Sequence, residues 1–351
     1  MTSATAASHP IVERVSIVKS RQWRPDEFLD RFQSLSIPLG DDPDGDGPID
    51  ATLVRAPLAA TSNGAVLYVH GFTDYFFQEE LAEFFTDRGY AFYAVDLRRC
   101  GRSLRDGDQP HYISDLKYYD RELTAALDVI VDEADDPESQ VLVIGHSTGG
   151  LITPLWLNRL RETDPDRHDR VKGLILNSPW LDLQGEAVLR TDAVGLVIKG
   201  VSKARPRVLV PRDLSDAYGE SLHVSRHGEW SYDLRCKPLT GFPVTFGWLS
   251  AVRAGQHRLH RGIDVGVPAL VLRSAKSWFS EKYRPEVDTA DCVLDVKQIA
   301  QWSGAIGRRV WAVAVPDARH DVFLSLETPR RIAYGEVQTW LTTMFGEGAQ
   351  Q

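Results

Sequence analysis

The amino-acid sequence predicts an α/β protein built on a mostly parallel, doubly wound sheet, with a long segment inserted between two late strands. Six short apolar runs are nearly continuous, as strands covered on both faces require. Helical patterns lie between these runs, and strand–helix alternation is typical of a parallel sheet with helices on both faces. After the fourth run the alternation stops for roughly ninety residues, which is too long for a connecting loop.

Each predicted strand is a short apolar run bounded by turn residues. The six runs are residues 65–70, 91–96, 141–145, 173–178, 269–274 and 310–316. The predicted helices between them are residues 79–89, 115–134 and 151–163. In the second helix, Leu116, Tyr119, Leu123, Ala126 and Ile130 recur at three- and four-residue steps and form one apolar face.

The long break in the alternation also predicts how the chain is divided. We expect an N-terminal extension, a core in two pieces and an inserted cap, over residues 1–50, 51–178 with 266–351, and 179–265. The cap is rich in Arg, His, Pro and Trp, and its helical pattern at residues 248–262 contains Trp248 on an apolar face.

Composition and charge exclude several classes of function. The chain has 351 residues and a formal net charge of -9, so nucleic acid and anionic membranes are not expected partners. Apolar runs are too short to cross a bilayer, and the first twenty residues do not resemble a signal peptide. Cys100, Cys236 and Cys292 are widely spaced and odd in number, which indicates reduced thiols. We therefore expect a cytoplasmic protein without stable membrane insertion.

The stretch VLVIGHSTGG, residues 141–150, places a serine between two glycines where a buried strand passes into a helix. Residues 145–149 fit the pattern G-x-S-x-G. The serine of such an elbow lies on a sharp, strained turn, and its flanking positions have to be small because neighbouring backbone passes close. The N–H groups of the following helix point to the same place. We therefore predict Ser147 as a nucleophile and Gly145 and Gly149 as the elbow glycines.

A serine nucleophile needs a base, which in this arrangement is a histidine after a late strand. Among ten histidines, His320 lies just past the last predicted strand, at the carboxyl edge of the sheet where ligands bind. A carboxylate has to orient that histidine, and Asp288, Asp291 and Asp295 all lie between the strand at 269–274 and His320. We favour Asp291, with Asp295 next. Asp295 could instead lie in the first turn of a predicted helix, a common structural position for an acid.

The sequence also predicts groups that would hold the substrate. The first strand runs into His70-Gly71-Phe72, so the N–H groups of Phe72 and Thr148 can form an oxyanion hole. The aromatic residues of the cap indicate an apolar pocket or a small core of the cap itself. We predict that His70, Trp180 and Trp248 contact the substrate.

An acidic turn at residues 41–50 has to be weighed as a metal site. Asp42, Asp44, Asp46 and Gly47 have the opening spacing of a calcium-binding EF-hand loop. The twelfth position of that loop is a bidentate glutamate, but here it is Leu53. We therefore expect a solvated acidic turn and no metal site.

Together these motifs resemble those of the α/β-hydrolases, and among them the monoacylglycerol lipase and lysophospholipase branch of serine hydrolases. The resemblance covers about residues 50–345 and rests on HGF at 70–72, DLRRCGRS at 96–103, GHSTGG at 145–150 and ARHD at 318–321. Two features depart from the family pattern. Arg99-Cys100 stands where the family often has Gly-His, and some fifteen residues precede the acid where a short loop is usual.

The resemblance implies an α/β-hydrolase fold and a serine hydrolase that needs no metal or organic cofactor. We expect it to cleave a small apolar ester, such as a monoacylglycerol or lysophospholipid, through an acyl-enzyme on Ser147. A serine peptidase or amidase on the same scaffold is an alternative, and it would hold a substrate amine with cap carboxylates such as Glu220, Glu229 and Asp233. A non-catalytic binding protein of this fold is the other alternative.

Overall fold

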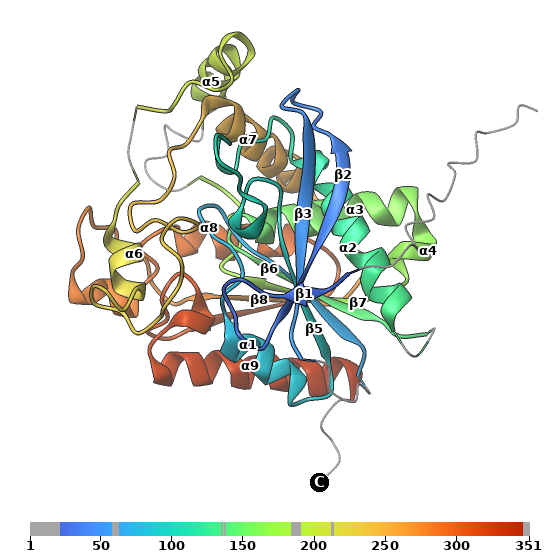
Figure 1. The fold of residues 1–351 in the computed structure, drawn as a ribbon. Helices are drawn as coiled ribbons and strands as arrows, with labels where there is room; N and C mark the ends of the chain where they lie inside the picture. The colour runs from blue at the N-terminus through green and yellow to red at the C-terminus, as the bar shows by residue number, and fades with distance from the viewer. Residues whose placement is uncertain are drawn as a thin grey trace, which may run out of the picture.

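A sheet of nine strands forms the centre of the computed structural model, which describes residues 22–57, 63–134, 136, 138–183, 191–211 and 214–346 (Figure 1). The strands are β1 (Arg24–Pro25), β2 (Gln33–Asp41), β3 (Pro48–Arg55), β4 (Ala65–Val69), β5 (Ala91–Asp96), β6 (Val141–His146), β7 (Val171–Asn177), β8 (Ala269–Ser274) and β9 (Val310–Val315). Their order in the sheet is β1-β2-β3-β5-β4-β6-β7-β8-β9. The strands from β4 onward pair in parallel, whereas β1, β2 and β3 pair antiparallel at one edge. The predicted sheet is therefore confirmed.

Helices cover both faces of this sheet (Figure 1). They are α1 (Glu79–Thr86), α2 (Asp120–Glu133), α3 (Gly149–Thr163), α4 (Pro165–His168), α5 (Asp192–Ala204), α6 (Ala217–Leu222), α7 (Phe246–His260), α8 (Val296–Trp302) and α9 (Glu327–Phe345). Apolar residues of α1 and α9 pack on one face, and those of α2, α3 and α8 pack on the other. The predicted helix at 115–134 is in fact a 3-10 turn, Leu116–Tyr119, followed by α2. Among the described residues, none of the helices is long and apolar enough to cross a membrane.

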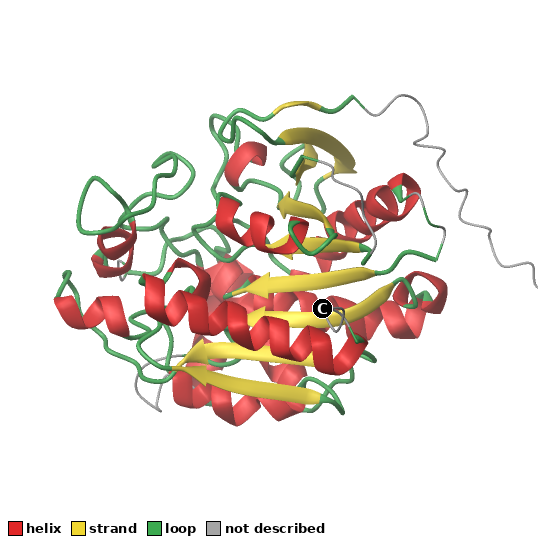
Figure 2. Ribbon diagram, turned by 90° about the horizontal axis from the view of Figure 1, so that it is seen from below, coloured by secondary structure: helices red, strands yellow, loops and turns green. Residues whose placement is uncertain are grey.

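The carboxyl ends of the parallel strands all lie at one edge of the sheet, where loops and short helices gather (Figure 2). The segment between β7 and β8 contributes α5, α6 and α7, and α7 contacts both α3 and α5. We call residues 179–265 the cap segment, as the sequence analysis did. The division of the chain into a core and a cap stays a proposal.

Residues 24–25, 33–41 and 48–50, which we expected to belong to an N-terminal extension, take part in the sheet. β2 pairs with β3, and β3 pairs with β5. In β2, Leu35 and Ile37 are buried while their neighbours face outward. Such alternation is typical of an antiparallel strand with one solvated face, and it is a weaker signal than the continuous apolar runs of the central strands.

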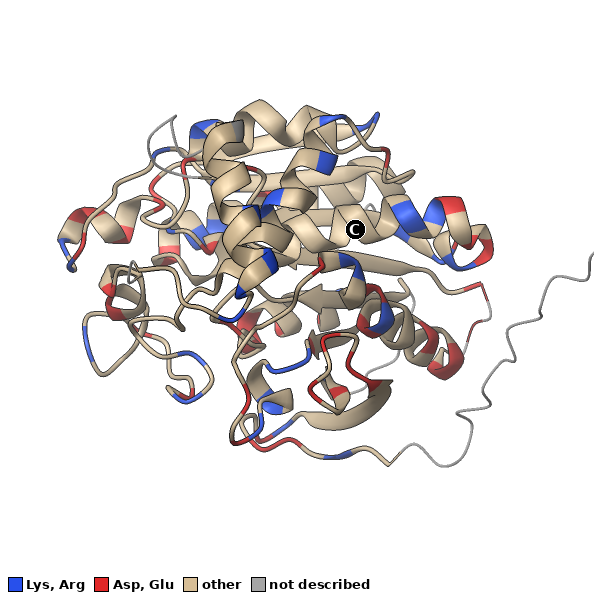
Figure 3. Ribbon diagram, turned by 90° about the horizontal axis from the view of Figure 1, so that it is seen from above, with Lys and Arg blue, Asp and Glu red and all other residues tan. Residues whose placement is uncertain are grey.

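The acidic turn between β2 and β3 is bound by arginines, so the expectation of a solvated turn is wrong for Asp42. Asp42 is buried and pairs with Arg99, and its carboxylate lies 3.5 Å from Arg98. Acidic and basic positions are interspersed along the ribbon (Figure 3). Arg98 also makes a bidentate ion pair with Glu122 of α2, with N–O distances of 2.5 and 2.7 Å. Arg99 has a φ of 56°. This left-handed conformation costs a residue that has a side chain about 1 kcal/mol, and the ion pair with Asp42 helps to hold Arg99 in it.

The beginning of α3 packs directly on the end of β4. A Cβ atom on Gly149 would lie 2.4 Å from the Val69 carbonyl oxygen and 2.5 Å from that of His70. Both are backbone atoms of the same strand end, so neither can move away as a side-chain tip could. The position therefore accepts only glycine.

We predict that Gly149→Ala lowers the free energy of unfolding by about 1–3 kcal/mol, because the added methyl overpacks the contact between α3 and β4. Gly335→Ala is the matched control, since Gly335 is exposed within α9 and its Cβ would meet no atom within 4 Å. We expect it to stabilise the protein by about 0.5–1 kcal/mol through helix propensity. Urea denaturation measures both, and equal effects of the two substitutions would contradict the close contact.

Candidate active site

Ser147 lies on the turn between β6 and α3, with a φ of 52°. Its amide donates to the Asn177 carbonyl at 3.0 Å, and its own carbonyl accepts from the Trp180 amide at 2.9 Å. A Cβ on Gly145 would lie 2.6 Å from the Gly149 carbonyl oxygen. The segment predicted as an elbow therefore has the left-handed serine and the crowded glycines that such a turn requires.

The structure brings His320 and Asp291 together at the carboxyl edge of the sheet. His320 follows β9, and Asp291 lies in the loop after β8. The Nδ1–H group of His320 donates to Asp291 Oδ2 at 2.9 Å, and both residues are buried. The other carboxylate oxygen, Oδ1, accepts from the amides of Val293 at 2.8 Å and Leu294 at 2.7 Å. Asp291 is therefore fixed in position and holds the imidazole with Nδ1 protonated.

The two competing carboxylates have other partners. Asp295 caps α8, where its side chain accepts from the Lys297 amide at 3.0 Å. Asp288 accepts from the Arg319 guanidinium at 2.7 Å and from the Tyr283 hydroxyl at 2.7 Å. Chain order alone leaves these aspartates equivalent, whereas the contacts single out Asp291.

The long loop before the acid is closed at its base. Ser277 and Asp291 form a parallel bridge, with the Asp291 amide donating to the Lys276 carbonyl at 3.0 Å. We call residues 279–290 the excursion. It packs on the cap segment, where the Tyr283 ring stacks on His227 with 3.8 Å between ring centroids. The extra residues therefore project outward and do not displace Asp291.

His320 also lies beside the elbow. Its ring centroid is 5.1 Å from that of His146, the residue that precedes Ser147. The Tyr218 ring of α6 meets His320 edge-on at 5.4 Å. Ser147, His320 and Asp291, which are far apart in the sequence, thus belong to one site.

The loop after β4 passes directly over Ser147. A Cβ on Gly71 would lie 2.8 Å from Ser147 Cβ and 3.4 Å from its Oγ. In the described part of the chain, the N–H groups of Phe72 and Thr148 donate no hydrogen bond. Phe72 follows Gly71, which lies against Ser147, and Thr148 follows Ser147, so the oxyanion hole stays a prediction for these two amides.

A buried aspartate that sequence reasoning did not single out anchors this loop. Asp96, at the end of β5, accepts from the Phe76 amide at 2.9 Å and from the Arg102 guanidinium at 2.9 Å. Arg102 in turn donates to the Phe76 carbonyl at 3.0 Å. The DLRRCGRS motif carried the signal, since Asp96 and Arg102 are two of its residues.

The ring of His70 is engaged on both sides by backbone. Nε2 accepts from the Leu97 amide at 3.0 Å, so Nδ1 carries the proton and donates to the Gly71 carbonyl at 2.7 Å. Burial lowers the pKa of His70, which keeps the ring neutral. His70 therefore supports the loop over Ser147, and its ring nitrogens are not available to a substrate.

Trp180 and Trp248 belong to a group of rings that we call the aromatic wall, made up of Phe72, His111, Trp180, Phe242 and Trp248. Trp248 packs on Phe72 with ring centroids 4.0 Å apart and on Trp180 at 5.6 Å. His111 lies 4.9 Å from Phe72 and 5.5 Å from Phe242. Because the Phe72 amide flanks Ser147, the wall gives the site an apolar side.

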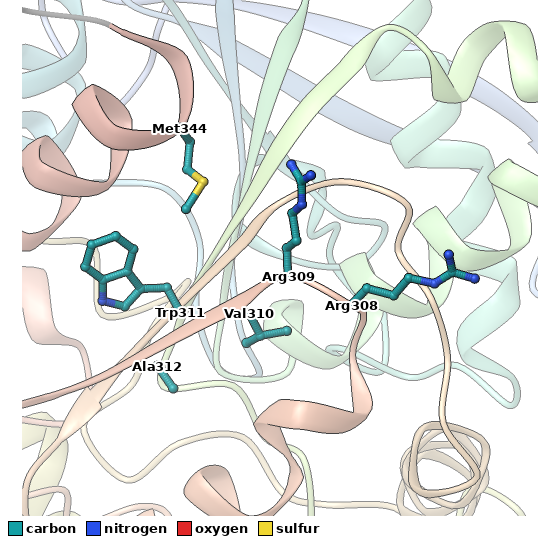
Figure 4. Close-up of a pocket in the computed structure, with 6 residues that line it drawn as sticks. All are labelled: Arg308, Arg309, Val310, Trp311, Ala312 and Met344. Carbon is teal, nitrogen blue, oxygen red and sulfur yellow. The ribbon is translucent and has the colours of Figure 1, made fainter.

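A hollow of about 490 Å³ lies away from this site. Its lining residues are Arg308, Arg309, Val310, Trp311, Ala312 and Met344 (Figure 4). It borders the beginning of β9, whereas His320 follows the end of that strand. We assign no reaction to this hollow.

The chain is similar to known proteins over most of its length. The family described as serine aminopeptidase, S33 matches residues 60–285. Phospholipase YtpA of Bacillus subtilis (strain 168) is 29% identical over 151 residues, 43% of this chain and 52% of that protein. The match thus spans about half the length of this curated relative.

Solved structures show the same fold at low sequence identity. A soluble variant of monoglyceride lipase from Saccharomyces cerevisiae has a TM-score of 0.64 at 16% identity, covering 97% of this chain and 99% of that one. Paleococcus ferrophilus monoacylglycerol lipase has a TM-score of 0.55 at 18% identity, covering 83% and 99%. The resemblance predicted from the motifs is confirmed. The chain belongs to the serine aminopeptidase S33 family and has the α/β-hydrolase fold.

Proposed function

We propose that this protein is a serine hydrolase that cleaves carboxylic esters with apolar acyl groups. The observation that carries the proposal is the pairing of His320 with Asp291 near a left-handed serine, next to two N–H groups that have no acceptor among the described residues. This set supplies a nucleophile, a base, an orienting acid and an oxyanion hole.

In the proposed reaction, Ser147 Oγ attacks the ester carbonyl. His320 Nε2 takes the hydroxyl proton, because Nδ1 already donates to Asp291. The carbonyl oxygen becomes negative and is held by the amides of Phe72 and Thr148. His320 then gives its proton to the leaving alcohol, and water releases the acid from the acyl-enzyme by the same steps.

The charges of the cap segment favour an ester over an aminopeptidase substrate. Each of the three carboxylates named for the peptidase alternative forms an ion pair. The pairs are Glu229 with Arg330 at 3.0 Å, Asp233 with Arg235 at 3.3 Å, and Glu220 with Arg226 at 3.6 Å. All three carboxylates that the peptidase alternative would use therefore have a cationic partner. The aromatic wall suits an apolar acyl chain, and the phospholipase and monoglyceride lipases reported above act on lipid esters by their names.

A second hollow, of about 300 Å³, supports a route for the substrate. It is lined by Gly107, Asp108, Gln109, Pro110, Leu209 and Pro243. Pro110 and Pro243 adjoin His111 and Phe242 of the aromatic wall in the sequence. We propose that an apolar substrate approaches the wall from this side.

A cytoplasmic location remains part of the proposal, supported by three free, buried cysteines.

Ser147→Ala tests the nucleophile. We expect hydrolysis of a graded series of p-nitrophenyl and glyceryl esters to fall by up to about a millionfold, because the group that forms the acyl-enzyme is lost. The wild-type protein should also be labelled on Ser147 by a fluorophosphonate probe, and the variant should not.

The same assays separate the alternatives. A wild-type protein that binds the esters but neither turns over nor takes the label would be a non-catalytic member of the fold. Faster cleavage of aminoacyl amides than of esters would instead favour the peptidase. Ordinary turnover by purified Ser147→Ala would end the serine-hydrolase proposal.

The acid is tested by a matched pair of substitutions. Asp291→Asn should lower kcat by about 10⁴-fold, because an amide in place of the carboxylate favours the wrong histidine tautomer. Asp295→Asn should leave turnover near that of the wild type, because Asp295 contacts the α8 backbone and asparagine is an equally good cap. Steady-state kinetics with circular dichroism to verify folding distinguish them, and the reverse pattern would move the acid to Asp295.

A further inference from the structure

A buried chain of charged groups lies behind the elbow and includes residues that the proposed reaction does not use. Lys237 Nζ donates to Asp74 Oδ1 at 2.7 Å. The other oxygen of Asp74, Oδ2, lies 3.1 Å from Nδ1 of His146. All three side chains are buried, and His146 directly precedes Ser147.

The lysine comes from the cap segment, and its two partners come from the core. Asp74 lies in the loop that passes over Ser147, and His146 ends β6. The ammonium group of Lys237 lies 5.6 Å from the Phe77 ring centroid, 5.7 Å from that of Tyr218 and 5.8 Å from that of Tyr232. These rings make cation–π contacts with the ammonium group and shield it from water.

The pair sets the charge state of this region. Burial alone would raise the pKa of Asp74, but the Lys237 cation and the His146 hydrogen bond outweigh it and hold that pKa well below its usual range. Asp74 is therefore ionised and its charge is balanced by Lys237. A buried carboxylate without a cation is costly and draws protons to its neighbours.

Those neighbours include the catalytic imidazole. The His146 ring is 5.1 Å from the His320 ring, and His146 Nε2 has no hydrogen-bond partner among the described residues. Asp321 Oδ2 lies 4.0 Å from that nitrogen. Other titratable groups that face this region are Tyr68, His70, His111, Tyr218 and Tyr232. His146 contacts Asp74 directly and His320 lies beside His146, so a change in the charge of Asp74 or Lys237 acts on both imidazoles.

We propose that Lys237 is a positioning residue of the site, which neutralises Asp74 so that the imidazole of His146 stays neutral and oriented beside His320. This inference rests on the proposed function. It gives the cap segment a part in the chemistry without contact between Lys237 and the substrate.

Two neutral substitutions should shift the pH dependence in opposite directions. Lys237→Met leaves the Asp74 carboxylate without its cation, so the imidazoles keep their protons to higher pH. We expect the acidic limb of kcat/KM for p-nitrophenyl butyrate to move upward by about one pH unit, with kcat lowered more than KM is raised. Asp74→Asn leaves the cation of Lys237 unpaired, and the limb should move downward by a similar amount.

The double variant Lys237→Met/Asp74→Asn removes both charges. We expect its acidic limb to return to the wild-type position and its kcat to exceed that of Lys237→Met. Lys117→Met is the matched control, because Lys117 makes an exposed ion pair with Asp115 at 3.4 Å. It should leave the profile unchanged. Circular dichroism and thermal unfolding of each variant verify that it is folded at the assay temperature.

NMR titration of the His146 and His320 ring signals, in the wild type and in the same four variants, gives a readout that does not need turnover. Opposite shifts of the imidazole midpoints in the single variants, cancelling in the double variant, would support the charge balance. Unmoved midpoints and limbs in folded variants would overturn it and leave Lys237 a purely structural ion pair. The variants could show these NMR shifts while the wild-type protein neither hydrolyses esters nor reacts with fluorophosphonate. That result would overturn the proposed function alone.

Discussion

The site depends on how closely three backbone segments approach one another around Ser147. The end of β4, the loop that follows it and the first turn of α3 meet where Gly71 and Gly149 leave no room for a Cβ atom. Ser147 has a left-handed φ of 52°, and its side chain lies directly against Gly71. The strain of a left-handed serine is of order 1–3 kcal/mol, and the surrounding packing holds it in place. Without that crossing, the two amides beside the serine would not lie together.

Loops carry the remaining groups, and each loop is fixed by bonds to backbone. Asp96 and Arg102 hold the loop over the serine at Phe76. Asp291 is held by the amides of Val293 and Leu294. The carboxylates of Asp96 and Asp291 are buried, and they hold loops that lie outside the sheet. Preorganised groups of this kind do not have to reorient as charge develops on the substrate.

The sequence predicted most of the central sheet, because strands buried on both faces are continuous apolar runs with a length typical of strands. It placed Ser147 and His320 by their positions after such strands. It did not predict β2, whose alternation is weak and contains Pro38, and it did not assign a partner to the acidic turn. It favoured Asp291 over its neighbours but could not show what fixes Asp291 in place, because the bridge between Ser277 and Asp291 is a long-range pairing that leaves no local pattern. Lys237 and Asp74 are distant in the chain, and neither lies in a periodic segment that would reveal their contact.

The excursion before Asp291 has a mechanical consequence. Its Tyr283 ring stacks on His227 of the cap segment, and the Ser280 carbonyl accepts from the Ser215 hydroxyl at 2.6 Å. The segment that carries the acid is thus fastened to the cap on one side and to the sheet on the other. If the cap segment moved away on this side, it would pull on the loop that carries Asp291. We therefore expect conditions that loosen the cap segment on this side to disturb the position of Asp291 as well.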